Sequence, residues 1–466
     1  MVTVTHVPPR SRILREPRVR VSVPPRSPFR DAEAAHPWAL PILLFVLPMF
    51  GQTFYYLVEF PIPYALSKGW PFLVLPLSVY ALFVYRLPYK AVFTLLLAYA
   101  IGITPLLGMM YFGNGFLDSL TTTIKIWPFT YYFALAALLV WLRPSLATLS
   151  TAFIILGLAT YVMMWVLWVA VPLDWYISDP AKGKLLMYEH ERGHRIYMPM
   201  LFGLIFLFYL ARRFCRRHEL WTILMLAVAF ASLLLIFKQR IAIMAAVLVV
   251  YGVIVTSTHG ALRRFLVAVG LLMASGVAAI ASGSIAEEFA GSLGGSLSIR
   301  LKSIDIAIDF LGSEPMRWLF GVGATTRFST ITLADIFQNK LFYLADIGWL
   351  GIVFEYGLVG ALLVVGTYLA GLIFIWNTGR IDGGYLARAL GDYTVFLFLT
   401  STVYSFVFTP GELATLVAVA AYIRARGPEP WLEAGTRIPG PVRALVMAPP
   451  VSPGTASPAP DPRPRA

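Results

Sequence analysis

Cysteine and charged side chains are scarce in this 466-residue sequence. The single cysteine, Cys215, excludes an intramolecular disulfide and a cysteine-based metal cluster. Charged residues make up only 13% of the chain, against roughly 25% in soluble globular domains, whereas 58% of the residues are hydrophobic and the mean hydropathy is +0.74. These values exclude a soluble globular protein and exclude disorder through most of the chain. The composition predicts an all-α, polytopic integral membrane protein.

The two ends differ in composition from the apolar middle. Residues 1–37 contain seven arginines and many prolines, and residues 425–466 are rich in proline, glycine and alanine, so both are expected to be disordered tails. A membrane helix needs about 20 apolar residues. We expect about twelve such helices, near residues 38–58, 70–85, 90–110, 127–142, 151–171, 198–211, 220–237, 241–257, 265–282, 348–376, 393–409 and 411–424. The span at 348–376 is long enough to tilt or break.

This count of spans predicts two long loops on one side of the membrane, 172–197 and 283–347, the larger of them containing short helices. Sorting the charges by side tests the count. With the N-terminus inside, the inner segments carry 24 basic and 9 acidic residues, so the net charge of +13 divides into +15 inside and −2 outside. The positive-inside rule therefore favours both termini on the cytoplasmic side. The excess of basic residues is therefore explained by the orientation of the helices in the membrane. For this reason no nucleic-acid partner is expected.

The cations that break this rule are candidates for binding an anion. Lys238 and Arg240 lie between two apolar spans at the expected outer boundary. An ordinary turn with snorkelling side chains is one interpretation. The other is an anion site, since a lipid-linked diphosphate would place its charge at this depth and arginine pairs bidentately with phosphate oxygens.

The outer loop at 172–197 contains a second group of cations and two histidines. Arg192 and Arg195 precede a span and fit the same anion-binding idea. His190 and His194 are four residues apart and would share a helix face. However, Gly193 lies between them and no H-E-x-x-H pattern is present, so a solvated loop is favoured and no metal site is expected.

The large outer loop and the span that follows it supply a third group of candidates. Residues 298–311 follow the pattern of an amphipathic helix and include Arg300. Asp346 lies near the outer end of the tenth span and Glu355 lies inside it. An ionisable residue inside a span predicts function; the structural alternative for Glu355 is a pair with an arginine or with a backbone group.

The sequence resembles the bacterial O-antigen polymerase and O-antigen ligase superfamily of integral membrane glycan enzymes. The resemblance covers about residues 190–375 and is carried by degenerate motifs in a characteristic order. They are Lys238-Gln239-Arg240-Ile241-Ala242 at the start of a span; Arg300 followed by Pro315 and by Leu319-Phe320-Gly321-Val322-Gly323; Asp346-Ile347-Gly348-Trp349-Leu350 through Glu355-Tyr356-Gly357-Leu358-Val359-Gly360; and, more weakly, Arg195-Ile196-Tyr197 with Pro199.

The resemblance implies metal-independent and cofactor-independent glycosyl transfer at the periplasmic face of the bacterial inner membrane. A glycan on undecaprenyl diphosphate would be moved onto an incoming lipid-linked repeat unit, in O-antigen or exopolysaccharide biosynthesis. A chain-length regulator and a repeat-unit flippase are the expected protein partners. The polymerase is favoured over the ligase, because Asp346 stands where ligases carry a histidine and residues 283–347 contain no histidine.

This reaction would need cations to stabilise the leaving group and a general base to activate the acceptor. Fixed cations would stabilise the diphosphate leaving group; Arg240 is the first candidate, followed by Arg195, Arg300, Lys238 and Arg192. A carboxylate would act as general base on the acceptor hydroxyl, and both Asp346 and Glu355 remain candidates.

Other classes of protein remain open. A ligase of the same superfamily would transfer finished glycan to another acceptor. A glycosyltransferase of another polytopic family would be expected to use an acidic residue in the first outer loop, where Glu59 is the one present. A lipid-linked-oligosaccharide transporter or flippase without enzymatic activity predicts charges buried along several spans, and the proposed spans contain few charges besides Glu355.

Overall fold

The computed structural model describes residues 37–113, 115–178, 183–190, 192–282, 295–323, 342, 344–382, 384–403 and 409–426. The two expected tails, at 1–37 and 425–466, lie almost wholly outside these residues, as do 283–294, 324–341 and 343 in the expected outer loop 283–347. The side chains of residues 276–282, 295–298, 345, 346 and 382 are also outside the description.

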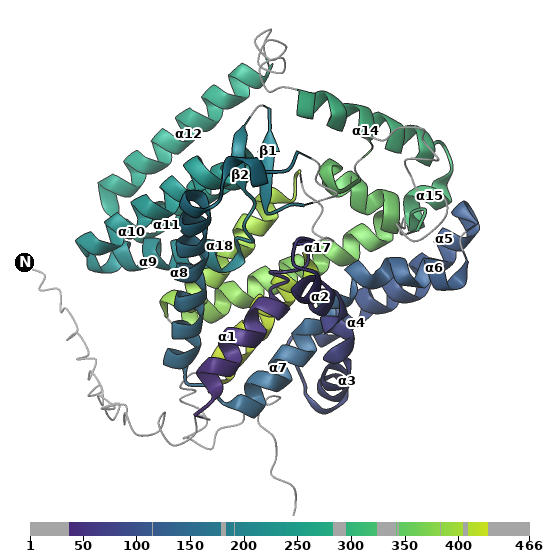
Figure 1. Cartoon of the computed structure of the whole chain (residues 1–466), viewed down its shortest axis with the longest axis horizontal. Helices are drawn as coiled ribbons and strands as arrows, with labels where there is room; N and C mark the ends of the chain where they lie inside the picture. Colours follow the sequence, from purple (N-terminus) through teal and green to yellow (C-terminus); the bar gives the residue numbers. More distant parts are fainter. Residues whose placement is uncertain are drawn as a thin grey trace, which may run out of the picture.

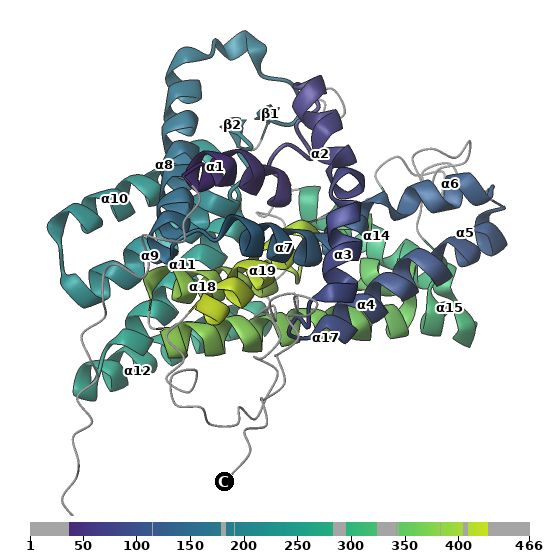
Figure 2. The same ribbon diagram turned by 90° about the horizontal axis from the view of Figure 1, so that it is seen from below.

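The described residues are mostly helical (Figures 1 and 2). The N-terminal half contains α1 (Ala39–Phe50), α2 (Pro61–Leu73), α3 (Leu75–Val84), α4 (Lys90–Ala98), α5 (Thr104–Phe112), α6 (Phe116–Thr121), α7 (Tyr131–Leu142), α8 (Leu146–Ala170) and α9 (Leu201–Arg217). The C-terminal half contains α10 (Leu220–Ala231), α11 (Arg240–Ser257), α12 (Gly260–Ser282), α14 (Gly295–Leu311), α15 (Pro315–Phe320), α17 (Trp349–Asp382), α18 (Tyr385–Thr400) and α19 (Pro410–Arg426).

Short helices and one hairpin complete the described fold. The π-helices are η1 (Tyr99–Ile103) and η5 (Ser232–Phe237), and the 3-10 helices are η2 (Thr122–Lys125), η3 (Trp127–Thr130), η4 (Leu173–Trp175) and η6 (Leu344–Ile347). Strands β1 (Leu186–Glu189) and β2 (Gly193–Ile196) pair antiparallel in the expected outer loop 172–197. The expected all-α architecture is therefore confirmed in outline, with this small hairpin added.

Local sequence explains where several helices begin and end. Ser145 precedes α8 and its side chain accepts a hydrogen bond from the amide of Thr148 at 3.0 Å, which is a typical N-terminal cap. Proline occupies the first turn of α2, where its missing amide costs nothing. α5 ends at Gly113, whose φ of +66° closes the helix in the left-handed conformation.

Each of the twelve predicted spans overlaps a described helix. By length and composition, six helical segments among the described residues are apolar enough to cross a membrane, at 61–84, 90–112, 146–170, 220–237, 240–257 and 349–381. A seventh results if the bent pair 116–125 and 127–142, which turns by 56°, is one span. The long predicted span at 348–376, for which a tilt or a break was expected, is broken at Gly357.

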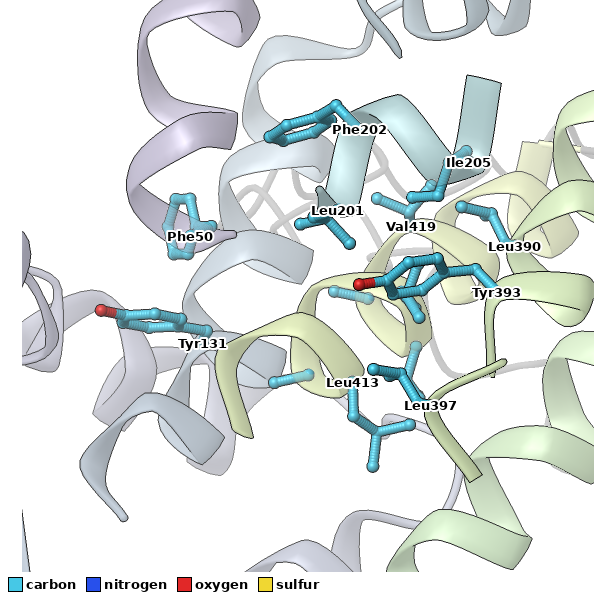
Figure 3. Packing of buried hydrophobic residues seen from close by; sticks show 14 of the residues in the cluster. Phe50, Tyr131, Leu201, Phe202, Ile205, Leu390, Tyr393, Leu397, Leu413 and Val419 are labelled. Carbon is cyan, nitrogen blue, oxygen red and sulfur yellow. The ribbon is translucent and has the colours of Figure 1, made fainter. Parts of the chain in front are cut away.

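The core lies where α1, α7, α9, α18 and α19 meet (Figure 3). Phe50 of α1 packs edge-on against Tyr131 of α7, with ring centroids 5.1 Å apart. α19 is surrounded on almost every side, since all its residues from Pro410 to Ile423 except Glu412 are buried. Outer helices instead expose apolar side chains such as Phe83, which is 80% exposed. Apolar side chains exposed in this way are expected on helices that face the hydrocarbon core of a membrane.

Candidate functional site

A buried ion pair joins two segments that are far apart in the sequence. The Lys125 ammonium contacts both carboxylate oxygens of Glu355, with Nζ 2.6 Å from Oε2. The two side chains are only 12% and 3% exposed. Lys125 ends η2, and Glu355 lies in the first part of α17. Each of these buried charges is stabilised by the other, because an unpaired charge in the protein interior is strongly unfavourable.

Sequence reasoning selected Glu355 but missed its partner. An isolated lysine at the start of a span has the ordinary interpretation of a snorkelling side chain. The available signal was local: Lys125 stands between Ile124 and Ile126, directly before an apolar segment. The predicted structural alternative for Glu355 was a pair with an arginine or the backbone, and the observed partner is a lysine.

Helix α17 is interrupted two residues after Glu355. Gly357 has φ +66° and ψ −178°, a conformation open only to glycine. The break frees backbone carbonyls, and amides from residues 319–323 satisfy them. Val322 donates to the carbonyl of Phe354 at 2.9 Å, and Gly323 donates to that of Glu355 at 3.1 Å. Two of the four motif-bearing stretches of the sequence analysis are therefore hydrogen-bonded to each other.

Glycines permit this close approach of two backbones. A Cβ on Gly321 would lie 2.6 Å from the carbonyl oxygen of Glu355, and one on Gly323 would lie 2.7 Å from Cα of Gly108 in α5. Both glycines also have positive φ values, +79° and +92°. A side chain at either position would separate the 319–323 segment from the helices that it contacts.

Tyr99, from a third segment of the chain, also contacts both of these stretches. Its hydroxyl is 2.8 Å from the carbonyl oxygen of Tyr356 and 3.1 Å from that of Phe320, both of which can accept its hydrogen. Tyr99 begins the π-helix η1, and π-helical turns occur frequently at functional sites. We call Tyr99, Lys125, residues 319–323 and residues 354–357 the α17 joint.

Asp346, the other predicted base, lies in η6 just before α17. Its side chain is outside the described residues, so the choice between Asp346 and Glu355 remains a prediction.

A second group of predicted residues surrounds the β-hairpin. Arg195 of β2 is 6% exposed and donates to the carboxylate of Glu189 and to Sδ of Met187, the latter at 3.6 Å. Arg192 also pairs with Glu189, at 3.4 Å. Lys238 donates to the carbonyl oxygens of Arg192 at 3.2 Å and of His194 at 2.9 Å.

Three of the five predicted diphosphate-binding cations, Arg192, Arg195 and Lys238, are thus brought together by the hairpin. We call these three residues the hairpin cations. Lys238 has the left-handed backbone conformation that separates η5 from α11, and its ammonium also lies 5.3 Å from the ring centre of Trp168.

The hairpin also settles how the two histidines are placed. His194 lies in β2 with its ring 4.9 Å from those of both Tyr176 and Tyr188, whereas His190 is in the exposed turn. They do not share a helix face, because the segment is not helical. Glu191 lies outside the described residues. In the described part of the chain, no three His, Cys, Asp or Glu side chains are grouped so as to hold a metal ion.

Arg240 and Arg300 differ from the hairpin cations. Arg240 is the first residue of α11 and is exposed, and none of the described residues forms an ion pair with it. Arg300 is half-buried on α14, which packs on α17 and η6. No hydrogen bond or ion pair among the described residues links Arg300 to the hairpin.

One further carboxylate inside a predicted span was missed. Glu412 lies in the first turn of α19 and accepts a hydrogen bond from the hydroxyl of Tyr393 at 2.9 Å. Its position next to Pro410 and Gly411 resembled a helix start at the membrane surface, and only the packing of α18 against α19 reveals this contact.

Lys238 is expected to hold the hairpin in place. In the Lys238→Met variant two backbone carbonyls lose a charged donor, and a hydrogen bond to a charged group contributes about 1.5–3 kcal/mol. We expect amide hydrogen exchange in residues 186–196 to accelerate by roughly tenfold or more. Arg240→Met is the matched control, since no described residue of the hairpin makes such a contact with Arg240, and equal exchange rates in the two variants would contradict this role for Lys238.

No protein-family model matches the chain, and no curated protein matches it.

Proposed function

We propose that this protein is a polysaccharide polymerase of the inner membrane that transfers an undecaprenyl-diphosphate-linked glycan onto a lipid-linked repeat unit at the periplasmic face. The observation that carries the proposal is the α17 joint. The motif at 319–323 and the motif around 354–357 form one hydrogen-bonded unit, and that unit encloses a buried pair of charges. Ionisable groups enclosed in this way inside a membrane segment are typical of functional sites.

The proposed reaction breaks one bond and forms another. The bond between the anomeric carbon of the donor glycan and its diphosphate oxygen breaks, and the diphosphate leaves with the bonding electron pair. A hydroxyl of the acceptor repeat unit forms the new glycosidic bond, and its proton passes to Glu355 or Asp346 as general base. A cation at the start of α11, Arg240, would stabilise the charge that develops on the diphosphate.

The exposure and contacts of each cation support a ranking for this role. Arg240 remains the first candidate, because its guanidinium is exposed and it stands at the N-terminus of α11, where the helix dipole also favours an anion. Arg195 and Lys238 already have partners in the hairpin, so they would support the site mainly by fixing its shape. Arg300 would contribute from α14.

In this scheme the ion pair between Lys125 and Glu355 opens when Glu355 is protonated. When Glu355 accepts the proton of the acceptor hydroxyl, Lys125 loses its counter-ion and becomes available to the departing diphosphate. Glu355 would thus act on the acceptor hydroxyl, and Lys125 would then act on the leaving diphosphate.

The proposed topology has twelve spans with both termini in the cytoplasm. Contacts between segments assigned to the same side support it. On the proposed outer side, the carboxylate of Glu59 accepts a hydrogen bond from the amide of Leu185 at 2.6 Å. On the proposed inner side, the hydroxyl of Tyr422 donates to the carbonyl of Pro144 at 2.6 Å.

Arg240→Ala tests the proposed function. In a host lacking the chromosomal gene, we expect the variant to insert normally but to lower chain elongation by about 100-fold, the usual effect of removing one group that stabilises developing negative charge. Single repeat units should accumulate. Arg263→Ala, an exposed arginine on α12, is the matched control.

Polymer-length analysis also separates this proposal from its alternatives. Finished polymer retained on the lipid carrier would indicate a ligase, and loss of lipid-carrier flux in proteoliposomes would indicate a flippase. Polymer of normal length from Arg240→Ala would remove Arg240 from the reaction.

A further inference from the structure

A basic cavity lies among α9, α11 and α18, away from the α17 joint and the hairpin. These three helices contact one another (Figure 1). The cavity has a volume of about 360 Å³, near the lower end of the range of about 300–1,000 Å³ for small-molecule sites. Its lining includes Arg212, Arg216, Arg388 and His259, together with hydroxyl groups from α11 and α18.

Three arginines from two helices converge on this cavity. Arg212 and Arg216 are four residues apart on α9, a spacing at which like charges repel, and α18 adds Arg388. Asp392 binds Arg212 through both oxygens at 2.6 and 2.7 Å, and its charge also acts on Arg388, so one described carboxylate faces three arginines. A surplus of positive charge remains, and a bound anion would relieve it.

Hydrogen bonds to the protein hold two of the three arginines in place, Arg212 and Arg388. Arg212 is fixed by Asp392 and also lies 3.4 Å from the hydroxyl of Thr256. Arg388 donates to the carbonyl of Gly379 at 3.3 Å. The guanidinium of Arg216 lies 6.0 Å from the ring centre of Tyr385. Arginine groups that are already ordered lose little entropy when they bind a ligand, and their planar forks match phosphate oxygens.

All three cavity walls come from segments that the charge distribution assigns to the cytoplasmic side. Residues 212–219, 258–264 and 377–392 are separate inner segments in that topology, and each contributes to this one cavity. A basic pocket between membrane helices on this side faces the anionic headgroups of the inner leaflet.

We propose that this cavity is a phosphate-binding site, occupied by the phosphodiester of an anionic phospholipid of the cytoplasmic leaflet. Arg216 and Arg388, which both line the cavity, bind the phosphate oxygens directly. The small volume admits a headgroup, while the acyl chains extend along the apolar surfaces of the neighbouring helices. The site is independent of the proposed glycosyl transfer.

Native mass spectrometry of the purified protein tests the proposal, with phosphatidylglycerol and phosphatidylcholine as the two lipid probes. We expect one phosphatidylglycerol molecule to bind selectively. The double variant Arg216→Gln/Arg388→Gln should weaken this binding by roughly tenfold or more, since each basic group near a membrane surface contributes substantially to the attraction. Arg212 is left intact, because its loss would strand Asp392.

The matched control is Arg263→Gln/Arg264→Gln, which removes the same charge from exposed positions on α12 outside the cavity. Equal weakening in both double variants would overturn the proposal in favour of general surface attraction, and so would equal binding of the two lipids.

Soluble glycerol phosphate is the ligand in a second experiment, which measures thermal stabilisation of the protein in detergent. Stabilisation by glycerol phosphate without selective lipid binding, lost only in Arg216→Gln/Arg388→Gln, would support the phosphate site but assign it to a soluble ligand.

Arg216→Lys/Arg388→Lys guards against a variant that simply fails to fold. This variant keeps the charge but loses the bidentate geometry. We expect it to retain selectivity for phosphatidylglycerol with intermediate affinity. If it binds phosphatidylglycerol no better than the glutamine variant while remaining folded, the charge of the cavity is not what binds the lipid, and the proposal fails.

Discussion

Lys125→Met is expected to destabilise the protein by about 3–5 kcal/mol, the usual cost of removing one partner from a buried ion pair. Glu355 would remain as a charge that is 3% exposed and has lost its ammonium partner. The measurement is the free energy of unfolding of the purified protein in detergent, from a denaturant titration. Arg217→Met is the control, because Arg217 is 59% exposed in its contact with Glu219 and exposed pairs contribute about 1 kcal/mol or less.

The double variant Lys125→Met/Glu355→Met separates stability from chemistry. Replacing both charges with apolar side chains of similar size is often neutral, so most of the lost stability should return. If the pair takes part in glycosyl transfer, the double variant will be folded but will not elongate the glycan. Full activity in this variant would leave the pair with a structural role alone, and wild-type stability in the single variant would contradict the buried pair itself.

Gly357→Ala is expected to cost about 3 kcal/mol or more, from two sources. The backbone conformation at Gly357 is strained for any residue with a Cβ, at about 1–3 kcal/mol. The new Cβ would also overlap the carbonyl oxygen of Leu319 and the amide nitrogen of Gly321. The segment 319–323 must therefore move away from α17, and the amides of Val322 and Gly323 should lose their protection against hydrogen exchange.

The same helix provides the control for this substitution. A Cβ on Gly366 would meet no atom within 4 Å. Gly366→Ala should therefore be neutral or stabilise the protein by about 0.5–1 kcal/mol, since alanine favours the helix. Equal stability of the Gly357→Ala and Gly366→Ala variants would show that the break in α17 does not require glycine.

The candidate site was only partly predictable. The location of Glu355 inside an apolar span marked it as unusual, and the glycines at 321, 323 and 357 were visible as parts of motifs. Their positive φ values and their contacts were not, because a glycine within an apolar segment is equally compatible with ordinary helix packing. The hairpin at 186–196 was likewise missed, since its short strands lie in a polar loop and depend on tertiary contacts such as that of Lys238.

By itself, the sequence determined the helical class of the fold and the positions of its apolar segments, because hydrophobic runs and charge bias are local properties that each segment carries alone. Only the tertiary structure decided which charges meet. Lys125 and Glu355 are 230 positions apart, and Arg388 reaches the cavity beside α9 from another helix. Such partners are fixed by the packing of distant helices, since a charge removed from water is stabilised by whatever group that packing places beside it.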